Sequence, residues 1–292
     1  MDLLEVRNLN KHYKQFDLKN ISFSIPAGYI MGYVGQNGAG KTTTISIITG
    51  VIHEDSGTIT IDGRTIKEDS IRYKDSIGYI ADDCFFSANF TIADICNTFA
   101  DFYPSFSKQK FMNYINQWNL PQKKQIKEFS RGMKLKTMFA EVFSRDTKVL
   151  MLDEATNGLD PVAKDEILSL MQEYIADGDR SILFSTHILS DLEQIADYIF
   201  FIDQGEKILA DTKDELTDSY LLVRADEKQL SEEQKQKIIG IRKSSVMMEG
   251  IIHTEDATCF HEGSVIEKPT IDQIVVHYIL ERKKKYRIGE IK

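Results

Sequence analysis

The segment Gly35-Gln36-Asn37-Gly38-Ala39-Gly40-Lys41-Thr42 constrains the fold of this 292-residue chain more than any other. It matches the pattern G-x-x-x-x-G-K-[ST] at every fixed position, and a continuous apolar run, residues 29–34, precedes it. In such a loop the glycines turn successive backbone N–H groups toward one point, and the helix that follows adds the positive end of its dipole. The segment therefore predicts a buried strand, a phosphate-binding loop and a helix from Lys41 to Thr49.

Two adjacent acids follow a second apolar run, Val149-Leu150-Met151-Leu152. Asp153, through water, and the Thr42 hydroxyl are predicted to hold Mg²⁺, which prefers oxygen ligands. Glu154 is predicted to polarise an attacking water as a general base. An apolar strand that ends in two acids is common by itself, but beside the phosphate loop the pair indicates phosphoryl chemistry.

Short apolar runs alternate with helical patterns along the chain, which indicates an α/β sheet covered on both faces. Half-buried strands are expected near residues 4–9, 21–25 and 58–61, and buried strands at 149–152 and 181–184. Residues 92–143 have a helical pattern. A helix is expected from Pro161 to Gly178, another capped by Ser190, and a hairpin that turns at Gln204-Gly205.

Over residues 2–212 the sequence resembles the ATP-binding-cassette (ABC) ATPases. Phe129-Ser130-Arg131-Gly132-Met133-Lys134 is similar to the family signature Leu-Ser-Gly-Gly-Gln, and it lies between the two phosphate-site segments as in the family. The resemblance implies the α/β fold of a P-loop ABC-type nucleotide-binding domain, with a mixed sheet, an antiparallel β edge and a helical subdomain. We expect this domain at residues 1–212, with the helical subdomain at about 84–143.

Residues 213–292 are expected to form a small α+β accessory domain that ends in a basic tail. The tail contains the run Arg282-Lys283-Lys284-Lys285-Tyr286-Arg287. Two interpretations of this run stay open. It is either a solvated helix end or a segment that approaches anionic lipid or a membrane partner.

The resemblance implies ATP and Mg²⁺ as cofactors and assigns roles to further residues. His187, in Ser185-Thr186-His187, is similar to the switch histidine, which implies that it contacts the γ-phosphate and positions the attacking water beside the catalytic Glu154. Tyr13 matches the adenine-stacking aromatic, with core packing as its alternative. The implied nucleotide-binding residues of one subunit are Tyr13, Gly35, Gln36, Asn37, Gly38, Ala39, Gly40, Lys41, Thr42 and Thr43. Those implied to face the nucleotide of a second subunit are Ser130, Arg131, Gly132 and Met133, and the D-loop-like segment 157–160 adds Asp160.

Three residues depart from the family pattern. Arg131 replaces the first glycine of the signature and Met133 its glutamine, so the backbone there is expected to have a conformation open to side chains. Asp82, in Ile77-Gly78-Tyr79-Ile80-Ala81-Asp82-Asp83, stands where the family carries the Q-loop glutamine. A carboxylate accepts from Mg²⁺-bound water but cannot donate as an amide does. Asp82 is therefore a third predicted metal-site residue, unless it belongs to an acidic surface turn.

Charge and hydropathy restrict the partners. The chain has 36 Lys and Arg against 45 Asp and Glu, a net charge of −9, which argues against a general nucleic-acid binder. No segment reaches the ~18 apolar residues of a membrane-spanning helix. A transporter built with this chain therefore needs a separate multi-span membrane subunit. The resemblance adds a second ABC ATPase subunit, identical or a paralogue. The aromatic-rich segment 84–106 is expected either to dock the membrane subunit or to form helical core.

The sequence thus predicts a Mg²⁺-dependent ATPase subunit that powers export and lies peripherally on the cytoplasmic face of the cell membrane. The nearest resemblance within the family is to ABC-2-type exporters, including those for antimicrobial and phenol-soluble peptides, so the exported substrate is expected to be a peptide, antibiotic or toxin. The alternative is a soluble ABC ATPase that uses ATP-dependent dimerisation for assembly or regulation.

Overall fold

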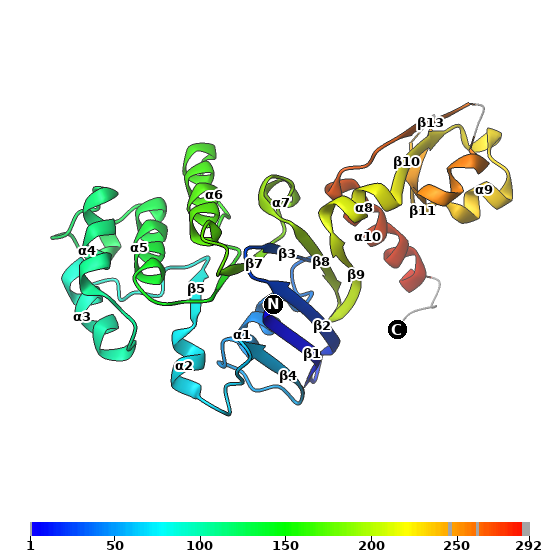
Figure 1. Cartoon of the computed structure of the whole chain (residues 1–292). Coiled ribbons are helices and arrows are strands. Elements are labelled where there is room, and N and C mark those ends of the chain that lie inside the picture. The colour runs from blue at the N-terminus through cyan, green and yellow to red at the C-terminus, as the bar shows by residue number, and fades with distance from the viewer. Residues whose placement is uncertain (1, 245–246, 261–262, 288–292) are drawn as a thin grey trace. The chain divides into compact units, whose positions relative to one another are not determined.

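The computed structural model describes residues 2–244, 247–260 and 263–287 (Figure 1). The chain divides into two compact units. The first contains Met1–Ile188 and Tyr198–Ala210, and the second contains Leu189–Asp197 and Asp211–Lys292. A short segment that interrupts the first unit in sequence therefore belongs to the second. Within the described ranges, every helix is too short or too polar to span a membrane.

In the described part of the first unit, nine strands form one mixed sheet in the order β4-β1-β2-β9-β8-β3-β7-β6-β5. β1 pairs antiparallel with β2 and β4, whereas β3, β5, β6, β7 and β8 pair in parallel. The strands are β1 (Asp2–Tyr13), β2 (Phe16–Pro26), β3 (Ile30–Val34), β4 (Ser56–Ile61), β5 (Ile77–Ala81), β6 (Val149–Asp153), β7 (Ser181–Thr186), β8 (Tyr198–Asp203) and β9 (Glu206–Thr212). The predicted mixed sheet with an antiparallel edge is confirmed.

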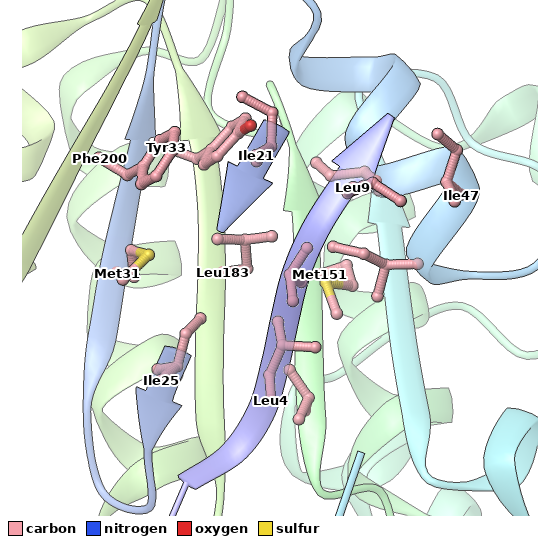
Figure 2. Close-up of a cluster of buried hydrophobic side chains, with 14 of the residues drawn as sticks. Leu4, Leu9, Ile21, Ile25, Met31, Tyr33, Ile47, Met151, Leu183 and Phe200 are labelled. Carbon is pink, nitrogen blue, oxygen red and sulfur yellow. The ribbon is translucent and has the colours of Figure 1, made fainter. Parts of the chain in front are cut away.

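The core of this unit lies where the sheet curls over itself. Figure 2 shows side chains of β1 and β2 facing those of β3, β6 and β7. Leu9 and Ile25 are fully buried against this cluster, and the rings of Tyr33 and Phe200 stack with centroids 5.0 Å apart. The alternating pattern of β1 and β2 buries one face, whereas β3, β6 and β7 are buried throughout. Burial of this apolar surface stabilises the curled arrangement.

Helices connect the parallel strands, and α3, α4 and α5 lie together beside β5 (Figure 1). These three form the helical subdomain expected at about 84–143. The predicted helical face of Leu135, Met138, Phe139, Val142 and Phe143 is buried. The helices of the first unit are α1 (Lys41–Ile48), α2 (Ser70–Asp75), α3 (Ile92–Phe102), α4 (Lys108–Gln117), α5 (Arg131–Phe143) and α6 (Pro161–Ile175).

Two predicted helix boundaries are wrong. α6 ends at Ile175 and not at Gly178, because the chain tightens there: the Ala176 amide donates to the Glu173 carbonyl and the Gly178 amide to the Ile175 carbonyl. Ser190 does not cap α7, which begins one residue earlier and covers Leu189–Ile195. The Thr186 hydroxyl accepts the Ile188 amide at 2.9 Å just before this helix.

The second unit is a small α+β fold, as expected. In its described residues, four strands form a sheet in the order β11-β12-β10-β13. The strands are β10 (Tyr220–Ala225), β11 (Ile239–Lys243), β12 (Met248–His253) and β13 (Ser264–Glu267), and the helices after α7 are α8 (Lys213–Ser219), α9 (Glu232–Lys237) and α10 (Ile271–Arg287). Buried Val223, Ile252 and Phe260 belong to its core. The basic run lies at the end of α10.

Candidate functional site

The phosphate-loop segment lies between β3 and α1, as the sequence predicts. Gly40 is the residue before the helix and has a φ of 113°, a conformation that L side chains rarely adopt. A Cβ atom at Gly40 would also approach Phe16 Cζ to 2.9 Å. Glycine is therefore required here both by backbone conformation and by the close packing of the loop on β2.

Lys41 is the charged group at the centre of the loop. Its side chain is only 4% exposed, and Nζ donates to the Gly35 carbonyl at 2.8 Å and to the Gln36 carbonyl at 3.3 Å. The same ammonium lies 3.1 Å from Glu154 Oε1. The loop and the end of β6 are thus joined by an ion pair, which brings together the two predicted halves of the phosphate site.

Glu154 follows β6 directly and has a positive φ of 55°. Its Oε2 accepts from Asn157 Nδ2 at 2.7 Å and lies 3.2 Å from His187 Nδ1. Burial works to raise the pKa of Glu154, but hydrogen bonding and charge from Lys41, with Asn157 and His187, outweigh it and hold that pKa below its usual value. In the free protein the predicted base is therefore ionised at neutral pH, which a general base requires.

Asp153, the last residue of β6, offers oxygen ligands for a metal ion. It is 6% exposed, and its Oδ1 is buried without a hydrogen-bond partner. The exposed Thr42, at the start of α1, lines the same pocket. A buried carboxylate oxygen in need of a partner, beside a hydroxyl, fits the oxygen donors that Mg²⁺ prefers.

These groups line one pocket of about 970 Å³, a size that suits a nucleotide. Among the predicted site residues, the pocket contains Tyr13, Asn37, Gly38, Gly40, Lys41, Thr42, Thr43, Asp82, Asp153 and Glu154. The other three predicted loop residues do not line the pocket but hold the loop in shape. The Gly35 and Gln36 carbonyls accept from Lys41, and the buried Ala39 donates its amide to the Gln36 carbonyl.

Tyr13 lies at the end of β1 and keeps 37% of its surface exposed, so core packing does not account for it. Its ring lies 6.4 Å from that of Phe16, and the Lys11 ammonium lies 5.7 Å from the Tyr13 ring centroid. The sequence analysis missed Gln15 and Phe16, which also line the pocket. Their place within three residues of Tyr13 in the sequence is a signal that would have found them.

The signature-like residues lie outside this pocket of their own chain. Ser130 caps α5, and its hydroxyl accepts the Met133 amide at 3.3 Å. Arg131 is the first residue of α5 and has the right-handed helical backbone that an arginine needs. Asp160 caps α6 and accepts the Val162 and Ala163 amides, each at 3.1 Å.

Asp82 follows β5 and is exposed at the wall of the pocket. Its partner is Arg131, whose Nη2 donates to Asp82 Oδ1 although the two residues are 49 positions apart. The structure therefore pairs two of the residues that depart from the family pattern.

A separate groove of about 480 Å³ runs along the aromatic-rich segment, and Tyr79, Phe85, Phe99 and Tyr103 line it with Glu141 and Arg145. Arg145 Nε lies 2.6 Å from Glu141 Oε1, and its guanidinium lies 3.9 Å from the Tyr103 ring centroid. Burial raises the pKa of Glu141 to about 7. Of the aromatics, Phe86 is buried in the helical core whereas Phe102 is 76% exposed.

Comparison with known proteins gives consistent matches. The family model described as ABC transporter matches residues 18–157. The ABC transporter ATP-binding protein YtrB of Bacillus subtilis is 31% identical over 76% of this chain and 76% of its own. The lantibiotic transport ATP-binding protein SrtF of Streptococcus pyogenes is 34% identical over 71% of this chain and 90% of its own. The linearmycin resistance ATP-binding protein LnrL of Bacillus subtilis is 31% identical over 73% and 70%.

A solved ATP binding subunit of an ABC transporter superposes with a TM-score of 0.67 and 28% identity, and covers 73% of this chain and 91% of its own. A second solved chain, cbiO1 from Clostridium perfringens, part of the ABC transporter complex cbiONQ, superposes with a TM-score of 0.64 and 25% identity over 74% and 90%.

Proposed function

Because this chain belongs to the ABC transporter ATPase family, we propose that it is the ATP-hydrolysing subunit that powers export of a substrate through a separate membrane subunit. The observation that carries the proposal is the single pocket in which the Lys41 loop, Asp153 and Glu154 meet. This arrangement provides a phosphate cradle, metal-binding oxygens and a base within one cavity.

Each residue then has a defined task in hydrolysis. The loop amides and Lys41 bind the terminal phosphates, and Tyr13 stacks on the base. Thr42 and Asp153 would hold Mg²⁺, which would supply positive charge at the phosphate oxygens. Glu154 accepts a proton from the attacking water. His187 lies 3.2 Å from the Glu154 carboxylate and orients it.

The signature-like residues Ser130 to Met133 and Asp160 are assigned to the nucleotide of a second ATPase subunit. Their position outside the Lys41 pocket of their own chain supports this assignment. The N-terminus of α5, with Ser130 as its cap, provides amide donors for a γ-phosphate. We propose a dimer, of identical chains or of paralogues, that closes on ATP.

The aromatic groove is the proposed docking site for the membrane subunit, which places this chain on the cytoplasmic face of the membrane. Exposed Phe102 and Ile71 line a second pocket, which shares Phe99 and Tyr103 with the groove. Such an exposed apolar area favours a partner. The names of the lantibiotic and linearmycin relatives support a peptide or antibiotic as the exported substrate.

The test is recovery of the chain from cells in mild detergent. We expect a multi-span membrane protein to co-purify with the wild type and to be lost in a Phe102→Asp, Ile71→Asp variant that still binds ATP. Val265→Asp, at an exposed apolar residue of β13, is the matched control and should keep the partner. Full recovery of the wild type as a free protein would instead favour the alternative, an ATPase that dimerises for assembly or regulation.

A further inference from the structure

The nucleotide pocket is more acidic than a polyanion site would be expected to be. Its lining residues include four carboxylates, those of Asp82, Asp83, Asp153 and Glu154, against one cation, Lys41. These groups alone give a charge of 1 − 4 = −3. A bound nucleotide adds further negative charge, so the pocket depends on positive charge supplied from elsewhere.

Of these four carboxylates, Glu154 is paired with a cation in the structure, whereas Asp153 would take its compensating charge from a bound metal ion. Glu154 lies 3.1 Å from the Lys41 ammonium. Asp153 keeps a buried oxygen without a partner and suits a divalent cation. Asp82 has neither arrangement, and its carboxylate points to a cation that does not itself line the pocket.

That cation is Arg131, whose guanidinium donates to Asp82 Oδ1 and forms an ion pair with it. The guanidinium also lies beside the segment after Glu154, since a Cβ atom at Gly158 would be 3.9 Å from Arg131 Nη1. The side chains of Arg131 and Asp82 are 37% and 48% exposed, so the contribution of this pair to folding stability is small. The pair nevertheless cancels one negative charge at the wall of the pocket.

We propose that Arg131 is a positioning residue that acts on the nucleotide of its own chain: by pairing with Asp82, it neutralises a carboxylate at the wall of an acidic pocket. This role rests on the proposed ATPase function and differs from the contact with a second subunit's nucleotide assigned above. It joins two residues that depart from the family pattern, Arg131 and Asp82, in one ion pair.

The expected effect is modest. Without Arg131, the unpaired charge of Asp82 repels the phosphate charge of a bound nucleotide. For two unit charges taken as about 8 Å apart, at an effective dielectric constant of about 60, this repulsion weakens the binding constant by roughly threefold. Removal of the guanidinium should therefore weaken nucleotide binding by about twofold to fivefold, and salt should reduce the difference.

The experiment measures ADP binding to the full chain by calorimetry, with Mg²⁺ and again with EDTA. ADP lacks the γ-phosphate that the signature of a second subunit is proposed to hold, so the measurement isolates the effect within one chain. The variants are Arg131→Gln, Arg131→Lys, Asp82→Asn and the double variant Asp82→Asn, Arg131→Gln. Arg64→Gln is the matched control, because Arg64 forms an exposed ion pair with Asp62 at 2.9 Å.

We expect Arg131→Gln to weaken ADP binding, more strongly in EDTA than in Mg²⁺, while Arg131→Lys and Arg64→Gln bind as the wild type does. The double variant removes both charges of the pair, so it should bind ADP about as the wild type does, and Asp82→Asn alone should bind ADP more tightly. A double variant that binds ADP as weakly as Arg131→Gln, or an Arg131→Gln variant that binds as the wild type does, overturns the proposal while leaving the ATPase function intact. Failure of the wild type to bind ADP at all would overturn the ATPase function and this role with it.

Discussion

Replacement of Glu154 by glutamine is the sharpest test of the chemistry. Glutamine keeps the size of the side chain but removes its charge and its ability to take a proton. The contacts that orient the carboxylate, 2.7 Å to Asn157 and 3.2 Å to His187, aim it at the pocket that Lys41 and Asp153 share. A positioned general base contributes ~10²–10⁴ in rate, so Glu154→Gln should slow ATP cleavage by that factor.

Nucleotide binding should survive this change. Lys41 keeps its hydrogen bonds to the Gly35 and Gln36 carbonyls, at 2.8 and 3.3 Å, and loses a carboxylate that competes with phosphate for its charge. We therefore expect ATP affinity at or above that of the wild type. Because cleavage is blocked, ATP should also accumulate a closed dimer on a sizing column.

The assay is single-turnover release of labelled phosphate with excess protein and Mg²⁺, which separates cleavage from product release. Glu166→Gln is the matched control, since this half-exposed carboxylate on α6 pairs with Lys136 at 2.9 Å and lies outside the pocket. It should cleave ATP as the wild type does. Cleavage by Glu154→Gln at the wild-type rate would show that Glu154 is not the base.

Two further predictions follow from buried charged groups. Lys41→Ala should abolish cleavage and weaken ATP binding by about tenfold or more, because a charged hydrogen bond to phosphate contributes ~1.5–3 kcal/mol. Calorimetry measures the binding and phosphate release measures the cleavage. Normal turnover in this variant would refute the loop assignment. Burial raises the pKa of Glu141 from 4.5 to about 7, so its favourable contribution to folding is complete below about pH 4.5 and is lost as pH rises to about 7. Relative to Glu141→Gln, the wild type should therefore lose on the order of 1–3 kcal/mol of unfolding free energy between about pH 5 and about pH 7.5 in urea titrations, and parallel pH profiles would contradict the raised pKa.

The sequence predicted those parts of the fold that local pattern determines. Continuous apolar runs predicted β3, β6 and β7, because strands buried on both faces are apolar over most of their length. Asp160-Pro161 found the start of α6, because capping and proline chemistry are local. The end of α6 was missed, since a tightened last turn leaves little trace in residue types.

Contacts between distant segments could not be predicted in the same way. The curl of the sheet brings Phe16 against Gly40, and the packing of α5 brings Arg131 to Asp82. Neither contact has a periodic or motif signal, because each depends on how two elements meet in space. The sequence predicted that Lys41 and Glu154 belong to one site, but it did not predict the ion pair that joins them.

The packing of Gly40 against Phe16 has a mechanical consequence. Phe16, at the start of β2, packs closely on the loop that holds Lys41. The distance between the Tyr13 end and the phosphate end of the pocket is therefore fixed by the protein before a ligand binds. A side chain added at Gly40 would displace Phe16 and lengthen the pocket. A ligand that contacts Tyr13 with a purine and the loop with its phosphates would then fit poorly at both positions.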